Sequence, residues 1–332
     1  MRTITLSQPA HIISYAAVGG KQEGNGPLGI RFDEIDPDSF CARNTWEQAE
    51  SELQSRALHH ALQKIDLESG DLDLAMGGDL MNQCIGTTFA LRDENIPLYG
   101  IYGACSTMGE GLSLAAMLIA GGQIKKAAVM TSSHFCTAER QYRNPLPYGS
   151  QRTPTAQWTA TAAGCCILGA EGGACRITRV CPGRIRDYGI ADANNMGAAM
   201  APAAIDTLSA VFADTRTAPQ DYDMIFTGDL GEVGHDIVVE LMGRQGYDLR
   251  RNYHDCGLLL YDRKRQDMHA GGSGAGCSAS VLCSWILPQI KNGIWRRVLF
   301  APTGALLSPT SSSQGESIPG ICHAVILEEE SQ

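Results

Sequence analysis

The amino-acid sequence predicts an α/β fold built from two similar halves. Residues 71–80 (DLDLAMGGDL) and 221–230 (DYDMIFTGDL) match at a fixed offset of 150. After each copy the same order follows: a Gly/Cys/Ser stretch, an apolar helix, a basic turn and a strand. Strands that alternate with helices imply crossover connections and a mostly parallel sheet. We therefore expect two halves, residues 1–178 and 179–332, with helices between and outside two sheets.

Each copy of the repeat also follows a segment with helical periodicity. In the first, Asn44 and Glu47 form the pattern of a capping box ahead of an apolar stripe that extends to Ile65. In the second, Pro202 suits the first turn of a helix that ends before Pro219. A chance similarity of two strand–helix units is the alternative, and the repeated order of the flanking elements argues against it.

The composition excludes several classes of protein. Charged residues make up 19% of the chain and its 44% hydrophobic residues occur in short runs, which argues against disorder and against membrane-spanning helices. The amino terminus lacks the apolar stretch of a secretory signal, so we expect an intracellular protein. A net charge of −10 without a Lys/Arg cluster argues against nucleic-acid binding.

Cysteine usage indicates reduced thiols rather than a disulfide framework. The chain has twelve cysteines and no secretory signal, which is typical of buried thiols in a reducing compartment. No C-x-x-C pair occurs, and the adjacent Cys165 and Cys166 are expected to point to opposite faces of a strand. We therefore predict no zinc or other metal site.

The duplication, together with GACS at 103–106 between a strand and an apolar helix, resembles thiolases and ketoacyl synthases. Longer stretches at 131–149, 151–164, 268–280 and 301–327 resemble the stage V sporulation protein AD family, and the similarity covers essentially the whole chain. This resemblance implies a thiolase-like duplicated fold, arranged as a layered α-β-α-β-α sandwich. It also implies non-enzymatic binding of dipicolinic acid (pyridine-2,6-dicarboxylate), which supports uptake of that compound into the developing spore.

The same resemblance implies partners and a location. The expected ligand is dipicolinic acid, with or without calcium, and no cofactor is expected. Other stage V sporulation membrane proteins are the expected protein partners, at the periphery of the inner membrane of the forespore or spore. Thiolase relatives are commonly dimers, which favours a homodimer.

Cys105 occupies the position at which the related enzymes carry their nucleophile. It ends an apolar strand, and Ser106 opens the next helix, whose unsatisfied N–H groups and positive end favour a thiolate. A buried thiol without a role is the simpler interpretation of a cysteine elsewhere. At this junction we predict that Cys105 lines a pocket.

The groups that would activate such a thiolate are absent from their expected positions. Condensing relatives supply His, with Asn or a second His, from the carboxyl-terminal half. The corresponding strand end at 227–230 reads TGDL and the loop at 271–274 reads GGSG, without His or Asn. His235 and His269 are the nearest candidates. We therefore predict no catalytic residues, and an active acyl-thioester condensing enzyme that uses Cys105 is the alternative.

Polar residues follow the strand AAVM, where an open α/β fold binds its ligands. Ser132, Ser133 and His134 can donate hydrogen bonds to a carboxylate, although structural hydrogen bonds would also explain them. Arg140 is predicted to contact a ligand carboxylate through two parallel hydrogen bonds. For Arg143 we favour a solvated or interface role.

The repeated acids Asp79 and Asp229 each follow Gly at a strand end. Each can cap the next helix, or one of them can line the pocket and meet a protonated ligand group or a cation. The glycine-rich loop at 271–276 lacks the Lys-Ser/Thr of a P-loop, so close backbone packing at the seam of the halves is preferred. The predicted ligand pocket lies at this seam, with Cys105 in its wall.

Overall fold

Among the described residues, the main sheet has 11 strands in the order β10-β9-β12-β15-β8-β1-β7-β5-β3-β4, with β2 (Glu34–Asp36) paired to β1. This computed structural model describes residues 1–142, 152–173 and 175–330. The strands of the first half are β1 (Ile4–Gly20), β3 (Leu74–Gly78), β4 (Leu98–Gly100), β5 (Lys126–Ser133) and β7 (Ala162–Gly169). Those of the second half are β8 (Cys175–Cys181), β9 (Met224–Thr227), β10 (Tyr253–Asp255), β12 (Arg297–Ala301) and β15 (Ala324–Glu329).

Both halves have the same strand order. From the centre outward, β1 is followed by β7, β5, β3 and β4, and β8 is followed by β15, β12, β9 and β10. If the strands of each half are numbered along the chain, both halves have the sheet order 1-5-4-2-3 from the centre outward. The three outer strands of each run are parallel, and the fifth strand is antiparallel to its neighbours. Asp79 and Asp229 follow the equivalent strands β3 and β9, so the prediction of two topologically equivalent halves is confirmed.

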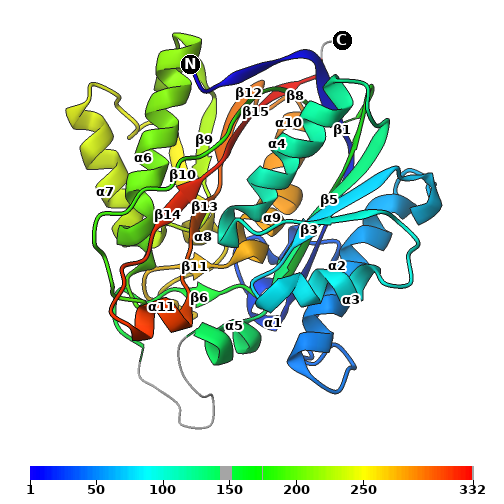
Figure 1. Cartoon of the computed structure of the whole chain (residues 1–332), viewed down its shortest axis with the longest axis horizontal. Helices are drawn as coiled ribbons and strands as arrows, with labels where there is room; N and C mark the ends of the chain where they lie inside the picture. The colour runs from blue at the N-terminus through cyan, green and yellow to red at the C-terminus, as the bar shows by residue number, and fades with distance from the viewer. Residues whose placement is uncertain (143–151, 174, 331–332) are drawn as a thin grey trace.

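The elements form five layers, which are visible in Figure 1. Three apolar clusters fill the space between these layers, and the largest of them surrounds the central helices. Helices α4 (Thr107–Ala120) and α9 (Ala275–Val281) lie between the two parts of the sheet, where Leu112 packs in one cluster with Val129 and Phe300. The outer helices are α2 (Trp46–Gln63) and α3 (Ile85–Leu91) on the first half, and α6 (Met196–Thr215) and α7 (Gly231–Arg244) on the second. The predicted α-β-α-β-α sandwich is therefore confirmed.

Two helices begin at different residues from those predicted. The N-cap of α2 is Thr45, whose hydroxyl accepts from the Gln48 N–H at 3.3 Å, so the capping box at Asn44 was wrong. Thr also accepts this bond, and Thr45 stands one residue nearer to the apolar stripe. Helix α6 begins at Met196, so Pro202 lies inside it rather than in its first turn.

Helix α6 (Met196–Thr215) is, among the described residues, long and apolar enough to cross a membrane by length and composition. However, 56% of its apolar window is buried inside the protein. Leu208, Val211 and Phe212 pack there in the outer cluster of the second half. The helix therefore has the surroundings of a core helix.

The long strand β1 joins the two halves. Its first part pairs with β8 and its second part pairs with β7, and both pairings are antiparallel. Cys165 and Cys166 on β7 enter different apolar clusters, so the predicted opposite orientation of these side chains is confirmed. The boundary proposed between residues 178 and 179 falls within β8, and it stays a prediction.

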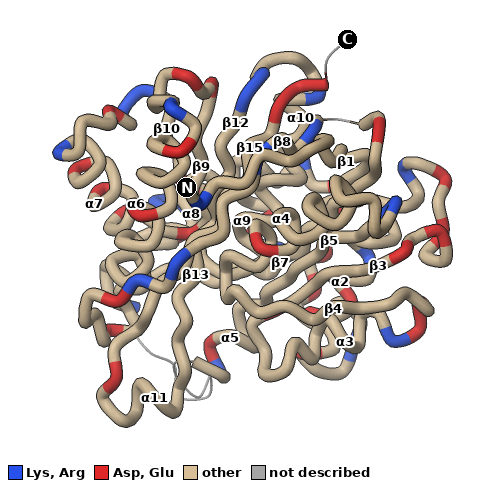
Figure 2. Tube along the Cα trace, turned by 45° about the horizontal axis from the view of Figure 1, so that its top comes forward, with Lys and Arg blue, Asp and Glu red and all other residues tan. Residues whose placement is uncertain are grey.

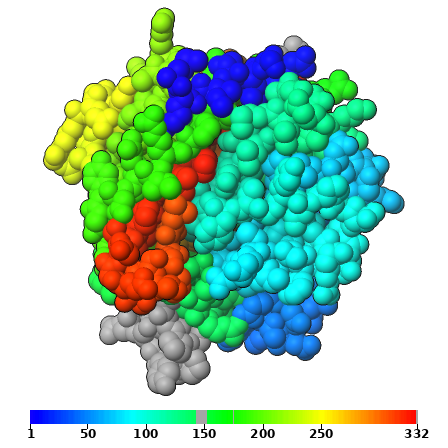
Figure 3. Space-filling model, in the orientation of Figure 1, coloured from blue at the N-terminus to red at the C-terminus, as the bar shows by residue number. Residues whose placement is uncertain are grey.

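Short elements close the seam at the carboxyl ends of the inner strands. Strand β6 (Trp158–Thr159) pairs with β11 (Gly272–Ser273), and β13 (Thr303–Ala305) pairs with β14 (Gly320–Cys322). Helix α5 (Phe135–Tyr142) follows β5 on the same side of the molecule (Figure 1). In Figure 3 the orange-red carboxyl-terminal segment lies between the green and cyan surfaces of the two halves. These elements surround the candidate site.

Candidate functional site

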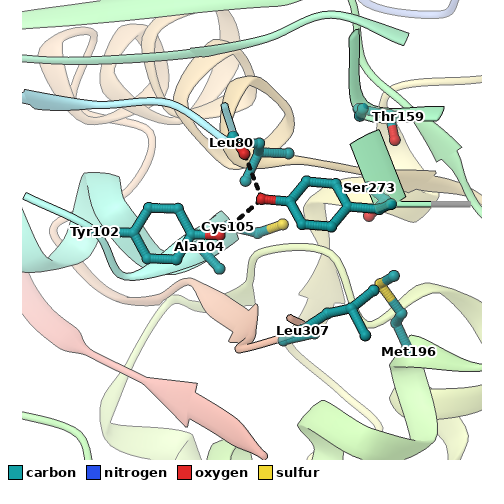
Figure 4. Close-up of a pocket in the computed structure, with 11 residues that line it drawn as sticks. Leu80, Tyr102, Ala104, Cys105, Thr159, Met196, Ser273 and Leu307 are labelled. Atoms are coloured by element: carbon teal, nitrogen blue, oxygen red, sulfur yellow. Dashed lines mark hydrogen bonds between the residues drawn. The ribbon is translucent and has the colours of Figure 1, made fainter. Parts of the chain in front are cut away.

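A small cavity lies at the seam between the halves, and residues of α5 and of the turn that carries Cys105 belong to its wall (Figure 4). Both halves contribute to its wall, which is mostly apolar. The lining residues are Leu80, Tyr102, Ala104, Cys105, Ala138, Tyr142, Thr159, Met196, Ser273, Ala305 and Leu307. The enclosed space is about 30 Å³, which accommodates a water molecule. Ligand pockets are commonly about 300–1,000 Å³, so an aromatic ligand requires side chains to move.

The Cys105 thiol is held in the cavity wall by a tight turn. Cys105 lies in a short 3-10 helix, η4 (Ala104–Ser106), and α4 begins after it at Thr107, one residue later than predicted. Ala104 has a φ of 50°, an uncommon value for a residue with a side chain. The Ser106 hydroxyl donates to the Gly103 carbonyl at 2.6 Å and fixes the turn. Backbone strain of this kind clusters at binding and active sites.

Asp229 lies directly behind this thiol and is fully buried. Its carboxylate accepts from the Gly274 N–H at 3.0 Å and from the hydroxyls of Thr303 at 3.0 Å and Ser273 at 3.1 Å. The Cys105 side chain is also hydrogen-bonded to it. Burial raises the pKa of Asp229 to about 7, because desolvation outweighs the stabilising hydrogen bonds. The thiol therefore faces a carboxyl group that is close to its titration point at neutral pH.

Two tyrosines close the outer side of the cavity. The Tyr102 and Tyr142 hydroxyls are 2.9 Å apart, and the Tyr142 hydroxyl also donates to the Leu80 carbonyl. Dashed lines in Figure 4 mark both contacts. Burial raises the pKa of both tyrosines, so they are neutral hydrogen-bonding groups at physiological pH. Tyr102 is 43% exposed, so the mouth of the cavity lies beside this ring.

No Lys, Arg or His belongs to the described residues that line the cavity. Figure 2 shows basic and acidic residues dispersed over loops and outer helices, whereas the central elements are mostly uncharged. A carboxylate ligand in this cavity would therefore be met by hydroxyls and backbone N–H groups. Within the part of the chain that the structure describes, no group of three His, Cys, Asp or Glu residues is arranged to hold a metal ion.

Comparison with known proteins identifies the family. A family model described as stage V sporulation protein AD matches residues 1–328. The chain is also 42% identical over 327 residues to stage V sporulation protein AD of Bacillus subtilis strain 168, covering 98% of this chain and 96% of that protein. The chain belongs to the stage V sporulation protein AD family. It is therefore a member of a family of sporulation proteins.

Solved structures show where the fold of this sporulation family is also found. The 3-oxoacyl-[acyl-carrier-protein] synthase III of Aquifex aeolicus VF5 aligns with a TM-score of 0.61 at 13% identity, covering 96% of this chain and 99% of that one. Cerulenin-bound OleA of Xanthomonas campestris aligns with a TM-score of 0.61 at 12% identity, covering 97% of both chains. At this level of identity the likeness shows the thiolase-like fold, as the sequence predicted.

In this family member, the two repeated acids have different surroundings. Asp79 accepts from the Met81 N–H at 3.0 Å and from the Thr87 N–H and hydroxyl at 2.7 and 2.8 Å. Asp79 therefore organises the turn and helix after β3, and it is not among the lining residues. Asp229 contacts Cys105 and Ser273, which both line the cavity. Of the two, Asp229 is the acid at the cavity.

Ser132, Ser133 and His134 are buried close to the cavity but do not line it. The Ser132 hydroxyl donates to Glu50 at 3.3 Å, and the Ser133 hydroxyl donates to the Ala160 carbonyl at 2.7 Å. His134 Nε2 lies 2.8 Å from the Ser39 carbonyl, and burial lowers the pKa of this imidazole. All three side chains are engaged in structural hydrogen bonds.

Arg140 lies outside the cavity, in a surface groove that it shares with Thr137 and Asn82. It forms an ion pair with Glu47 and lies over the Trp46 ring, 5.6 Å from its centroid. It is therefore not positioned to hold a ligand carboxylate beside Cys105. Arg143 lies outside the described residues.

The two histidines considered as partners for Cys105 also lie elsewhere. His235 stacks on Tyr253 with ring centroids 4.9 Å apart. His269 Nδ1 lies 2.6 Å from the Thr153 carbonyl. Neither belongs to the described lining residues.

The glycine-rich loop packs closely at the seam, as predicted. A Cβ at position 276 would lie 2.1 Å from the Ala162 carbonyl oxygen, and Gly274 has a φ of 101°. The Gly276 N–H donates to the Ser133 hydroxyl at 3.0 Å, which connects the two halves. Glycine is required here because a side chain would collide with backbone.

Proposed function

We propose that this sporulation protein binds dipicolinic acid without catalysing a reaction, and that this binding supports uptake of the compound into the developing spore. The observation that carries the non-enzymatic part is the contact between Cys105 and Asp229. A nucleophilic thiol is activated by a neighbouring base that becomes positive, such as histidine. A carboxylate instead opposes a second negative charge on the adjacent sulfur. Asp229 therefore hydrogen-bonds Cys105 without supplying the positive charge that would favour a thiolate.

The cavity supports the ligand-binding part. Its apolar wall suits an aromatic ring, and Tyr102, Tyr142, Thr159 and Ser273 offer hydroxyls for carboxylates. Cations are lacking among the described lining residues, so a bound dianion would depend on these donors, with calcium as an accompanying ion where it is present. Because the enclosed space is about 30 Å³, we expect binding to require displacement of α5 or of the tyrosine pair.

Calorimetric titration of dipicolinate tests this placement. Ala138→Leu fills the cavity from α5 and should abolish binding, and Cys105→Ala, which removes a side chain from the cavity wall, should weaken it. Arg140→Ala is the matched control, because Arg140 stands two positions after Ala138 on the same helix but points into the surface groove. A loss of affinity in Arg140→Ala alone would move the site to that groove. Normal binding by Ala138→Leu and Cys105→Ala would refute the placement.

An acyl-thioester enzyme is the second candidate. The observation in its favour is the strained turn at Ala104, which holds Cys105 at the end of α4 that faces the cavity. Incubation with acyl-CoA, followed by mass spectrometry of the Cys105 peptide, separates the two functions. Stable acylation with turnover at roughly 1–10³ s⁻¹, the usual range of enzymes, would favour the enzyme.

We also propose that the protein acts as a homodimer. Strand β4 ends the sheet, and Phe89, Tyr99 and Tyr102 beside it are 48%, 61% and 43% exposed. An exposed edge strand with aromatic neighbours is suited to pairing with a second copy. Such pairing would cover the mouth of the cavity at Tyr102. Analytical ultracentrifugation of the wild type and of Tyr99→Arg tests this, and two monomeric samples would overturn it.

The proposed place of action is the forespore or spore, at the periphery of its inner membrane and together with stage V sporulation membrane proteins. Membership of the stage V sporulation protein AD family supports a role in sporulation. Fractionation of sporulating cells, with detection of this protein in the inner-membrane fraction before and after a high-salt wash, tests it. A protein found entirely outside the spore compartment would contradict the proposal.

A further inference from the structure

Two buried carboxyl groups lie behind the cavity without a cationic partner. Glu50 on α2 and Asp79 after β3 are both fully buried. Glu50 accepts from the Thr137 hydroxyl at 2.6 Å and from the Ser132 hydroxyl at 3.3 Å. Neither acid has an ion-pair partner among the described residues, since Arg140 pairs instead with Glu47. Two charges in such surroundings are costly because each lacks compensation.

Each acid is connected to a residue that adjoins the cavity wall. Glu50 holds Thr137, and the next residue on α5, Ala138, lines the cavity. Asp79 directly precedes Leu80, which also lines the cavity and whose carbonyl accepts from Tyr142. The Gln141 side chain donates to the same carbonyl at 2.9 Å. The two acids therefore lie at the base of the contacts that hold α5 against the segment after β3.

The charge of this pair depends on pH within the physiological range. Burial, and then repulsion from Asp79, raises the pKa of Glu50 to about 8. Burial also raises the pKa of Asp79, although hydrogen bonds from Thr87 and Met81 oppose the shift. At neutral pH Glu50 therefore holds a proton, and it becomes negatively charged as the pH rises through about 8.

The other titratable groups around Glu50 and Asp79 carry no positive charge that could compensate for the loss of this proton. On the α3 side, burial and then Asp79 raise the pKa of Cys84. Beside β4, burial raises the pKa of Tyr102, with a smaller contribution from Asp79. Before α5, burial lowers the pKa of His134. All three groups are therefore neutral at pH 7 and offer no positive charge to the pair.

We propose that the buried carboxyl groups of Glu50 and Asp79 control the opening of the Cys105 cavity. While Glu50 is protonated, α5 is docked and the cavity is closed. When that proton is lost, the new buried charge on Glu50 weakens the contacts of Thr137 and Leu80, and α5 moves away. The role of this motion in dipicolinate access rests on the proposed function, whereas the motion itself does not.

Hydrogen exchange of the α5 amides, followed by mass spectrometry at pH 6 to 9, tests the proposal without a ligand. Glu50→Gln carries no titrating proton, and comparison with the wild type at each pH cancels the intrinsic pH dependence of exchange. We expect the exchange rate of α5 in the wild type, divided by that in Glu50→Gln, to rise about tenfold between pH 7 and 9, the change that corresponds to one pKa unit. A ratio that stays constant over this range would overturn the proposal.

Two further variants keep the test decisive. Glu47→Gln is the matched control, because Glu47 lies on the same helix and contacts α5 through Arg140 at the surface. Its α5 exchange should keep the pH dependence of the wild type. Thr137→Val serves if Glu50→Gln does not fold, because it removes the hydroxyl that connects Glu50 to α5. We expect α5 of this variant to exchange faster than α5 of the wild type at every pH. If its exchange rate rises above pH 8 as much as that of the wild type does, the mechanism is also refuted.

The outcome is separable from that of dipicolinate binding. If α5 shows the predicted pH dependence but dipicolinate does not bind, the proposed function fails and the control of the cavity stands. If dipicolinate binds but α5 exchange shows no pH dependence, the proposed function stands and the control of the cavity fails. If both hold, dipicolinate should associate faster at pH 9 than at pH 7 in the wild type and equally fast at both in Glu50→Gln.

Discussion

The Cys105 side chain of the first half is hydrogen-bonded to the Asp229 carboxyl group of the second half. The contact joins the turn before α4 to the segment after β9. It also gives the thiol a carboxyl group rather than a histidine as its neighbour. The chemistry of the cavity therefore depends on the charge of Asp229.

Asp229→Asn should make Cys105 easier to alkylate. Removing the carboxylate removes the repulsion that opposes a thiolate, so we expect alkylation of Cys105 by iodoacetamide at pH 8 to be at least about tenfold faster, equivalent to one pKa unit. Peptide mapping of the labelled protein measures the rate at this position. Cys136, which is half-buried on α5, provides an internal control. Equal Cys105 rates in the wild type and the variant would contradict the effect.

The same substitution should flatten the pH dependence of stability. The folded-state pKa of Asp229 is raised from 3.8 to about 7. A raised carboxyl pKa contributes stability that is present below the unfolded pKa and is lost as the pH rises through the folded pKa. The free energy of unfolding of the wild type should therefore fall more between pH 4 and pH 8 than that of Asp229→Asn, by more than about 1.4 kcal/mol. Urea titrations at both pH values measure this, and parallel pH profiles would argue against it.

Gly304→Ala should disturb the turn that holds Cys105. A Cβ at this position would lie 2.3 Å from the Gly103 carbonyl oxygen and 3.1 Å from the Ser106 nitrogen, both backbone atoms. Overpacking of this kind costs about 1–3 kcal/mol, which thermal or urea unfolding will detect. Gly70→Ala is the matched control, since a Cβ there would meet nothing within 4 Å. If the two variants are equally stable, the backbone around Cys105 can move to accommodate the added Cβ and the prediction is wrong.

Tyr142→Phe should loosen the mouth of the cavity at a small cost in stability. The variant loses the bonds of this hydroxyl to Leu80 and Tyr102, while Gln141 still donates to the Leu80 carbonyl at 2.9 Å. We expect a loss of about 0.5–1.5 kcal/mol, the usual net value of a hydrogen bond, together with faster association of dipicolinate in stopped-flow measurements. Tyr188→Phe is the control, because Tyr188 is 74% exposed. Unchanged association in Tyr142→Phe would assign the barrier to another group.

The repeat at 71–80 and 221–230 was sufficient to predict the two equivalent halves. Its residues fix β3, β9 and the acids after them, and these elements are local and periodic. Cys105 was found because a strand, a turn and a helix meet there in sequence. The five-layer arrangement then followed from the resemblance and from the alternation of apolar segments.

The rest of the cavity was not accessible from the sequence. Met196 and Ser273 reach the cavity only through long-range packing, and the Tyr102–Tyr142 contact joins the end of β4 to the end of α5. The burial of Glu50 was not predicted, because an acidic residue in an amphipathic helix is normally expected on its exposed face. The strand was predicted to end before Ser132, but β5 extends through Ser133, so of the three residues His134 alone follows its end. Hydrogen bonds to Glu50 and Ser39 use the polar atoms of Ser132 and His134.

Strand β1 limits when either half can fold. It is made well before its partners β7 and β8, which begin at Ala162 and Cys175. Pairings this distant in sequence are slow to form because a long loop must close first. During synthesis β1 therefore lacks these two neighbours until β8 has left the ribosome. Its edges for β7 and β8 stay unpaired throughout that time, so the nascent protein should depend on chaperones and should aggregate when truncated before β8.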